Sequence, residues 1–273
     1  MRIQEALQQA ALLRVARLDA QLLLAHLLQR PREWLIAHDD DELPADLAAR
    51  CVELLRQRAD EVPLAYLTGQ KEFHGLALQV NPATLVPRPD TETLVDWALE
   101  LLPPQQPAEL LDLGTGSGCI ALALKAARPQ AQVCAVDRSA AALAQAQANG
   151  EHLGLAVEWL EGSWFQPLTD RRFDLIVSNP PYIRADDPHL AALRHEPLSA
   201  LAAGADGLDD LRLLCAQAPG FLRPDGWLLL EHGFDQADAV TQLLRQAGFA
   251  PAQHRIDLGG HRRCTGAQLA LHT

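Results

Sequence analysis

The sequence predicts an α/β domain with a mostly parallel, seven-stranded sheet, preceded by a small all-α domain. Apolar runs typical of buried strands lie at 109–113, 132–137, 157–160, 173–178 and 226–231, and helical stretches at 118–127, 138–149 and 208–222 separate most of them. Strands that alternate with helices of about 10–15 residues indicate a parallel sheet covered on both faces. Residues 1 to about 60, in contrast, show apolar positions at helical spacing.

The N-terminal segment, residues 1–68, is predicted to be a helical bundle. Its apolar residues recur at helical spacing and include Leu7, Ala11, Leu12, Leu22, Leu23, Leu24, Leu27, Leu28, Leu47, Cys51, Leu54 and Leu55. Asp19 and Pro44 are expected to start helices, and Pro31 separates two of them. No residue of this segment has a catalytic signature, so we expect it to recognise a substrate or simply to pack as a domain.

Residues 69–108 are expected to form a hairpin, a proline-rich turn, a helix from about Thr91 and a linker from Leu102. Residues 109–273 then form the α/β domain, which we expect to carry the active site. Its tail, "QHRIDLGGHRRCTGAQLAL", predicts two further strands around Gly259 and Gly260, as an antiparallel edge of the sheet.

Charge and composition exclude several classes of protein. The net charge of −12 is unlike the basic surface of a general nucleic-acid binder, so no direct nucleic-acid partner is expected. No apolar run reaches the roughly 18 residues needed to span a membrane, and a cytoplasmic location without membrane contact is expected. The five cysteines include no C-x-x-C pair, which indicates reduced thiols, and His261-x-x-Cys264 alone predicts no metal site.

A glycine-rich loop follows the first strand of the α/β domain. In "LLDLGTGSGCIALAL", Gly114, Gly116 and Gly118 stand at a strand-to-helix turn, where backbone amides can approach a ligand. The next strand ends at Asp137, 19 residues after Gly118, and its carboxylate can accept hydrogen bonds from both ribose hydroxyls. A nicotinamide cofactor is an alternative, but the third glycine comes one residue too early for G-x-G-x-x-G. The spacing, with Asp112 opening the loop, resembles that of Rossmann-like S-adenosylmethionine methyltransferases.

The fourth strand runs directly into Asn179-Pro180-Pro181-Tyr182, where two consecutive prolines fix the backbone. A planar amino group is a poor nucleophile because its lone pair is delocalised, so acceptors must hold its two N–H bonds. The Asn179 side-chain oxygen and the Pro180 carbonyl suit this role, and Tyr182 offers a flat wall. The motif resembles that of methyltransferases acting on glutamine amides, on exocyclic amines of adenine or cytosine, and on guanine N2. The alternative is that the Asn-Pro-Pro-Tyr segment has no catalytic role and is only a stiff loop after a strand.

Three further stretches carry a closer resemblance: "LVPRPDTETLVDWAL" at 85–99, "EPLSAL" at 196–201 and "GWLLLEHG" at 226–233. Over essentially its whole length the chain is similar to the peptide chain release factor glutamine N5-methyltransferases, the HemK/PrmC family. The resemblance implies transfer of a methyl group from S-adenosyl-L-methionine to the glutamine amide nitrogen of the Gly-Gly-Gln motif in release factors, leaving S-adenosyl-L-homocysteine. Release factors are the implied protein partners.

The same resemblance implies roles for individual residues. The catalytic residues would be Asn179, Pro180, Pro181 and Tyr182, and the cofactor-binding residues would be Gly114, Thr115, Gly116, Ser117, Gly118, Asp137, Trp164 and Asn179. Arg88 and the Thr91-Glu92 pair would form part of the lid of the cofactor pocket. Family members usually carry an acid just before the Trp-Phe pair, whereas this chain has Ser163, which brings no charge to the adenine.

Three alternatives are compatible with the sequence. Glutamine methyltransferases that act on a ribosomal protein share the Asn-Pro-Pro-Tyr motif but differ within the Arg-Pro-Asp-Thr-Glu stretch. A methyltransferase of nucleic-acid amines is disfavoured by the acidic charge, and a non-catalytic cofactor-binding adaptor by the intact motif.

His232, at a strand end, is not expected to be a catalytic base, because an amide proton can leave after methyl transfer.

Overall fold

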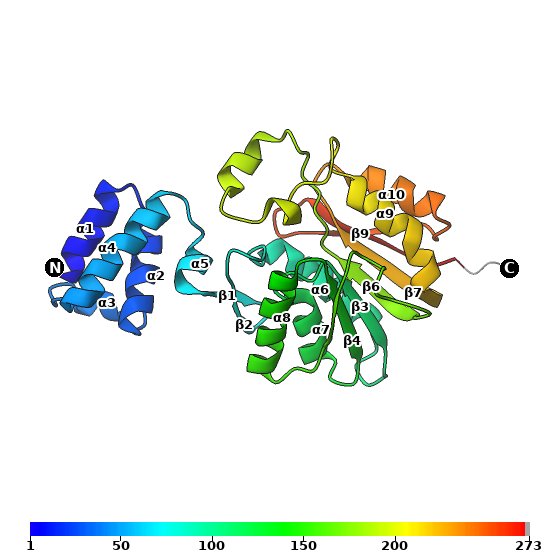
Figure 1. Ribbon diagram of the computed structural model, residues 1–273, viewed down its shortest axis with the longest axis horizontal. Coiled ribbons are helices and arrows are strands. Elements are labelled where there is room, and N and C mark those ends of the chain that lie inside the picture. The colour runs from blue at the N-terminus through cyan, green and yellow to red at the C-terminus, as the bar shows by residue number, and fades with distance from the viewer. Residues whose placement is uncertain (271–273) are drawn as a thin grey trace. The chain divides into compact units, whose positions relative to one another are not determined.

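The computed structural model describes residues 1–270, which fall into two compact units (Figure 1). The first unit is Met1–Gln70, and the second begins at Lys71. The expected boundary after residue 68 lies two residues before this division.

The first unit is a helical bundle with its own apolar core. Its helices are α1 (Ile3–Leu12), α2 (Arg17–Leu28), α3 (Trp34–Ala37), α4 (Ala45–Ala59) and α5 (Leu64–Thr68). Pro44 is the N-cap residue of α4, as expected. Helix α2 starts at Arg17, before Asp19. The Asp19 carboxylate accepts a hydrogen bond of 2.7 Å from Arg58. Leu12, one of the apolar residues at helical spacing, is 85% exposed, because the buried stripe of α1 runs through Ile3, Ala6 and Ala10.

The chain then forms a two-stranded hairpin, β1 (Gln70–Phe73) and β2 (Leu76–Gln79), followed by α6 (Pro89–Leu101). Helix α6 begins two residues before the expected Thr91, because Pro89 occupies its first turn, where a missing N–H costs nothing. Thr91 is therefore held inside the first turn, with a buried side chain.

The predicted mostly parallel, seven-stranded sheet is confirmed. Its strands are β3 (Glu109–Leu113), β4 (Gln132–Asp137), β5 (Glu158–Glu161), β6 (Phe173–Ser178), β7 (Leu222–Glu231), β8 (Gln253–Ile256) and β9 (Arg262–Gln268). They lie in the order β5-β4-β3-β6-β7-β9-β8, and only β9 runs against its neighbours. The expected antiparallel pair is present, but the reversed strand lies inside the sheet and β8 forms the edge.

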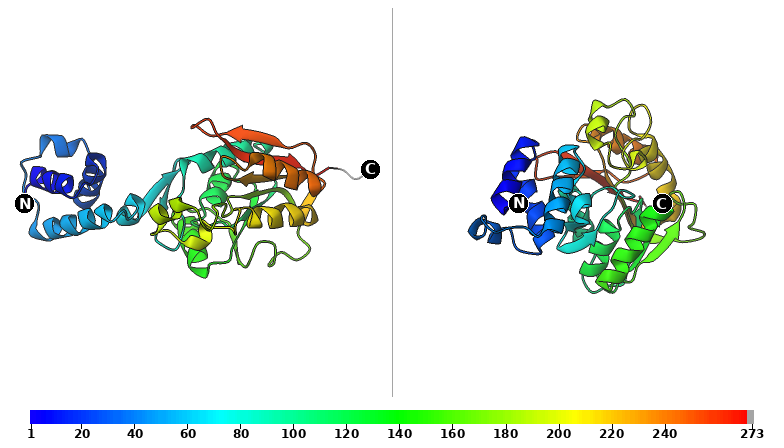
Figure 2. Two further views of the ribbon diagram at one scale, coloured as in Figure 1. Left: turned by 90° about the horizontal axis from the view of Figure 1, so that it is seen from above. Right: turned by 60° about the vertical axis from the view of Figure 1, so that its left-hand side comes forward.

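Helices cover both faces of this sheet (Figures 1 and 2). They are α6, α7 (Cys119–Ala127), α8 (Ala140–Leu153), α9 (Asp209–Gln217) and α10 (Ala237–Gln246). Short 3-10 turns lie at Pro188–Leu193, Leu198–Ala200 and Ala218–Phe221. One core joins α6 and α7 to strand residues such as Leu110, and the other joins α9 and α10 to the next residue, Leu111. Successive side chains thus alternate between the two cores.

The expected helix at 208–222 ends early. Helix α9 stops at Gln217, a 3-10 turn containing Pro219 follows, and β7 starts at Leu222 rather than at Gly226. The added length of β7 is irregular, since its register against β6 shifts between Phe173 and Leu175.

A carboxyl group is buried within the central strand β3. Asp112 is fully buried. Its Oδ2 accepts hydrogen bonds from Thr115 Oγ1 at 2.6 Å and from the Ala121 N–H at 3.2 Å. Its Oδ1 has no hydrogen-bond partner among the described residues. Burial raises the pKa of this carboxyl to about 7, although the two hydrogen bonds act against the shift.

We expect Asp112→Asn to change how stability depends on pH. A carboxyl whose pKa is raised on folding stabilises the protein at low pH, and this contribution is lost as the pH rises through about 7. Asparagine does not titrate, so the variant should gain stability relative to the wild type between about pH 4 and pH 8, by about 1.4 kcal/mol per unit of pKa shift at most. Urea unfolding of both proteins across this range measures the difference. A difference that stays constant with pH would contradict the expectation.

Candidate active site

The glycine loop turns the chain at the carboxyl edge of the sheet. Gly114 and Thr115 both donate backbone N–H groups to the Val136 carbonyl, at 2.9 and 3.1 Å, which ties the loop to the adjacent strand β4. Gly114 has φ of +73°, and a Cβ there would lie 3.3 Å from the Trp164 ring. Gly118 has φ of +83°, and its Cβ would come within 3.1 Å of side chains on α7, α8 and β5. Conformation and close packing both require glycine at these two positions.

Asp137, at the end of β4, is fixed by the backbone around it. Its Oδ2 accepts the Gly116 N–H and its Oδ1 accepts the Ser139 N–H, both at 2.8 Å. A carboxylate oxygen can accept two hydrogen bonds, so each oxygen keeps capacity for a hydroxyl donor. Asp137 therefore both shapes the glycine loop and offers two oriented acceptors beside it.

The predicted cofactor residues surround one pocket. Its lining includes Gly114, Thr115, Gly116, Ser117, Asp137, Trp164 and Asn179, together with Arg88, Thr91, Arg138, Ser163 and Pro181. Gly118 supports the loop from behind and is not part of the lining. Glu92, expected in the lid with Thr91, points elsewhere and accepts the His74 N–H at 3.1 Å, because adjacent residues of a helix face different directions.

Trp164 closes one side of this pocket. It has φ of +52° and packs against Gly114. Ser163 lies beside it in the pocket lining, where the family pattern has an acid. Burial raises the pKa of the nearby Asp210 carboxyl on α9, and Trp164 acts against this shift.

A second pocket adjoins the first at the Asn-Pro-Pro-Tyr segment. It is lined by Leu85, Arg88, Asn179, Tyr182, Ile183, Leu193, Ala200 and Leu201. Leu85, Arg88, Asn179 and Ala200 line both pockets. Pro181 faces the first pocket and Tyr182 the second, whereas Pro180 is buried and lines neither. Asn179 therefore stands at the junction, where groups bound in the two pockets would meet.

An ion pair joins two of the stretches that carry the family resemblance. The buried carboxylate of Glu196 accepts the Val86 N–H at 3.1 Å and a hydrogen bond from Arg88. Nearby, Arg138 donates to the Ser199 carbonyl at 2.9 Å. These contacts hold the 196–201 segment against the pockets and explain how Arg88, a polar residue, contributes to the walls of both.

Asn149 of α8 supports the site although no sequence signal indicated it. This residue is fully buried, and its Oδ1 accepts the Gln79 N–H at 2.8 Å. Its Nδ2 donates to the carbonyls of Gln79 and Ser117, both at 2.9 Å, and so ties the hairpin to the glycine loop. Its position inside an Ala- and Gln-rich helix gave no signal, because the partners are distant in sequence.

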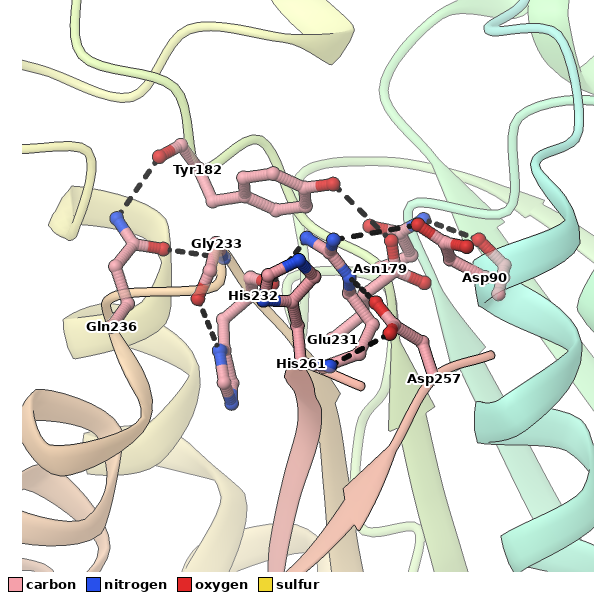
Figure 3. Close-up of polar contacts among 11 residues, drawn as sticks. Asp90, Asn179, Tyr182, Glu231, His232, Gly233, Gln236, Asp257 and His261 are labelled. Carbon is pink, nitrogen blue, oxygen red and sulfur yellow. Dashed lines mark hydrogen bonds and ion pairs between the residues drawn. The ribbon is translucent and has the colours of Figure 1, made fainter. Parts of the chain in front are cut away.

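Glu231, at the end of β7, lies beside the Asn-Pro-Pro-Tyr segment and contacts Tyr182 (Figure 3). It is 1% exposed, and the Tyr182 hydroxyl donates to its Oε1 at 3.3 Å. Burial raises the pKa of Glu231 to about 7, against the effect of hydrogen bonds and of the nearby Arg263. Burial and the Glu231 charge likewise raise the pKa of the Tyr182 phenol, so Tyr182 remains neutral.

His232 is a structural residue. Its ring nitrogens lie 2.8 Å from the Gly233 carbonyl and 2.6 Å from Thr265 Oγ1, and it lines neither pocket. Burial lowers its pKa to about 4, so the ring is neutral at physiological pH. This arrangement agrees with the expectation that His232 is not a catalytic base.

No helix in residues 1–270 is long and apolar enough to cross a membrane. Over the same range, no group of three or more His, Cys, Asp or Glu side chains is arranged to hold a metal ion. His261 and Cys264, the closest sequence match to a metal pair, do not belong to such a group.

Comparison with known proteins identifies relatives over nearly the whole chain. Residues 2–69 match the PrmC N-terminal domain and residues 92–198 match the methyltransferase small domain. A release factor glutamine methyltransferase of Xylella fastidiosa is 51% identical over 263 residues, covering 95% of this chain and 96% of that protein. One from Escherichia coli is 43% identical over 266 residues, covering 96% of each.

A solved structure supports the fold. The T. thermophilus 16S rRNA N2 methyltransferase RsmC, in complex with AdoMet and guanosine, has a TM-score of 0.57 and 21% identity, covering 74% of this chain and 50% of that one. At this identity the likeness concerns the fold alone, whereas the relatives above establish the family. The chain belongs to the release factor glutamine methyltransferases.

Proposed function

We propose that this protein transfers a methyl group from S-adenosyl-L-methionine to the side-chain amide nitrogen of the glutamine in the Gly-Gly-Gln motif of release factors. The observation that carries the proposal is the junction of two pockets at Asn179. One pocket has the glycine loop and the ribose-type acid, and the other has the tyrosine that would flank a planar amide. Family membership supplies the chemical class of the acceptor.

The pocket lined by the glycine loop fits S-adenosylmethionine by its chemistry. Asp137 would accept the ribose hydroxyls, the glycine loop would surround the amino-acid part, and Trp164 would lie beside the adenine. The buried Ser117 hydroxyl has no hydrogen-bond partner among the described residues and offers a further polar contact. When bound, the cofactor supplies an electrophilic methyl group on a positively charged sulfur.

The residues of the junction would make the amide reactive. An amide nitrogen shares its lone pair with the carbonyl, so it must be oriented before it can attack a methyl group. Asn179 Oδ1 and the Pro180 carbonyl would accept its two N–H bonds and direct the lone pair toward the donor. The prolines fix the backbone at this point, so little reorganisation is needed in the transition state. Tyr182, neutral and held by Glu231, would cover one face of the amide.

We further propose that the N-terminal unit helps to recognise the release factor and that the reaction takes place in the cytoplasm. The unit has its own core and exposes Leu12 and Ile36, which are 85% and 73% accessible. Exposed apolar side chains suit a protein partner, and the net charge of −12 favours a protein over a nucleic acid as substrate.

Methyl transfer from labelled S-adenosylmethionine tests the proposed function. Purified release factor is compared with a variant in which the glutamine of Gly-Gly-Gln is replaced by alanine. We expect label in the wild-type factor only. No label in either, with cofactor binding verified by calorimetry, would reject release factors and direct the assay to ribosomal proteins and then to nucleic acids.

Asn179→Ala should lower kcat by roughly 100-fold or more, because it removes an acceptor needed mainly in the transition state. The Kd for S-adenosylmethionine should change by less than about threefold, since Asn179 contributes only part of the pocket wall. Steady-state kinetics and calorimetry measure the two effects, with the exposed Gln147→Ala on α8 as control. An equal loss of cofactor affinity and rate would rule out the amide-orienting role.

Asp137→Ala should instead act on cofactor binding. Charged hydrogen bonds contribute about 1.5–3 kcal/mol each, so the Kd for S-adenosylmethionine should rise roughly tenfold or more. Calorimetry of this variant and of Asp186→Ala, which removes an exposed carboxylate, separates the local effect from a general change in charge. Unchanged affinity in Asp137→Ala would place the ribose elsewhere.

A further inference from the structure

The side chain of Gln236 joins three segments that are distant in the sequence, one of which is the Asn-Pro-Pro-Tyr segment. Its Oε1 accepts the Gly233 N–H at 2.8 Å, within the turn between β7 and α10. Its Nε2 donates to the Tyr182 carbonyl at 3.0 Å and to the Gly207 carbonyl at 3.3 Å. Figure 3 shows the side chain between Gly233 and Tyr182. Gln236 is only 9% exposed, so these hydrogen bonds are largely shielded from water.

The backbone groups around this amide determine its orientation. A backbone N–H can only donate, and a backbone carbonyl can only accept. The oxygen of the Gln236 amide must therefore face Gly233, and its nitrogen must face the carbonyls of Tyr182 and Gly207. None of these groups titrates, so the hydrogen bonds do not depend on a protonation state.

Gly207 shows how closely the chain approaches the Tyr182 carbonyl. It has φ of +74°, and a Cβ there would lie 2.3 Å from the Tyr182 oxygen and 2.8 Å from Gln236 Nε2. Any side chain at residue 207 would therefore displace the Tyr182 carbonyl, the Gln236 amide or both. Glycine is needed at this position for the hydrogen bond between Gln236 and Tyr182 to form.

The prolines transmit the position of Tyr182 to the Pro180 carbonyl. Proline fixes φ of Pro180 and Pro181, and a residue that precedes proline is restricted to an extended ψ. The two prolines also have no N–H, so the backbone donors of this segment lie at its ends. At the C-terminal end, the Tyr182 N–H donates to the Leu201 carbonyl at 3.2 Å and the Tyr182 carbonyl accepts from Gln236. These two hydrogen bonds therefore fix where the Pro180 carbonyl and the Tyr182 ring lie.

We propose that Gln236 is a positioning residue for the methyl transfer, which holds the Tyr182 carbonyl and thereby places the Pro180 carbonyl and the Tyr182 ring against the acceptor amide. Without this donor, the C-terminal end of the stiff segment would shift. The shift would misalign the acceptor nitrogen with the methyl group, and reaction rates are sensitive to such misplacement. This inference rests on the proposed function and adds to its site a residue that lines neither pocket.

Gln236→Met tests the role directly, because methionine keeps the length of the side chain and removes the amide. We expect kcat for methylation of release factor to fall about tenfold or more. The Kd for S-adenosylmethionine should change by less than about threefold, because Gly233, Tyr182 and Gly207 do not line the glycine-loop pocket. A kcat within about threefold of the wild type, or an equal loss of cofactor affinity, would contradict the proposal.

Gly207→Ala perturbs the same carbonyl from the loop before α9 and does not depend on the folding of Gln236→Met. The added methyl group displaces the Tyr182 carbonyl, so kcat should again fall about tenfold or more. Gly260→Ala is the matched control, because Gly260 also has a positive φ, +83°, but a Cβ there would meet no atom within 4 Å. This variant should keep kcat within about threefold of the wild type. Equal losses of kcat in the two glycine variants would contradict the proposal.

A double variant separates the effect on Tyr182 from an effect on the turn at Gly233. If both substitutions act through the Tyr182 carbonyl, the variant with Gln236→Met and Gly207→Ala should have kcat within about threefold of the worse single variant. Two effects that multiply would show that Gln236 acts elsewhere, and the proposal would be wrong. Urea unfolding verifies that each assayed variant is folded.

These outcomes differ from a failure of the proposed function. A wild-type protein that binds S-adenosylmethionine but does not methylate release factor contradicts the proposed function. An active wild type with an unimpaired Gln236→Met variant contradicts only the positioning role of Gln236.

Discussion

The parallel register of β3 and β6 is the constraint on which the site depends. Leu113 pairs with Ser178, so the two strands end side by side, and Ser178 Oγ donates to the Leu113 carbonyl at 2.7 Å. The glycine loop follows one strand and the Asn-Pro-Pro-Tyr segment follows the other. Because parallel strands all point the same way, their following loops gather at one edge of the sheet, where open α/β folds bind ligands. A donor pocket and an acceptor pocket can therefore share Asn179 without a long flexible loop.

Around this edge the protein keeps polar groups that weaken the core but orient the site. Asp112 and Glu231 are both buried, and each has one oxygen without a partner among the described residues. Asn149 is buried as well, and its hydrogen bonds join the hairpin backbone at Gln79 to the glycine-loop backbone at Ser117. Fixed dipoles of this kind suit catalysis by positioning, because they need no rearrangement when charge develops at the reacting atoms. The stability for this arrangement comes from the two apolar cores that cover the sheet.

Much of the fold and the site was predictable from local sequence signals. The bounds of β3, β4 and β6 agree with the apolar runs, because buried parallel strands are continuously apolar and end at turn residues. The start of β7 was wrong, since Pro219 and an irregular register break the simple pattern. Leu12 is exposed because helical spacing does not determine which stripe of a helix faces the core, and α2 starts two residues before Asp19. The contributions of Asn149, Glu231 and Gln236 depend on tertiary hydrogen bonds between distant segments, which no local pattern reveals.

A crystal structure with S-adenosyl-L-homocysteine and a peptide containing Gly-Gly-Gln would test the central claim most directly, since it shows the atoms around the reacting nitrogen. We expect the glutamine amide in the pocket lined by Tyr182, with its nitrogen donating to Asn179 Oδ1 and to the Pro180 carbonyl and pointing at the sulfur. The Asn179 nitrogen should remain bonded to Thr91. A glutamine bound outside this pocket, or held by its carbonyl oxygen at Asn179 instead of by its nitrogen, would contradict the proposed arrangement.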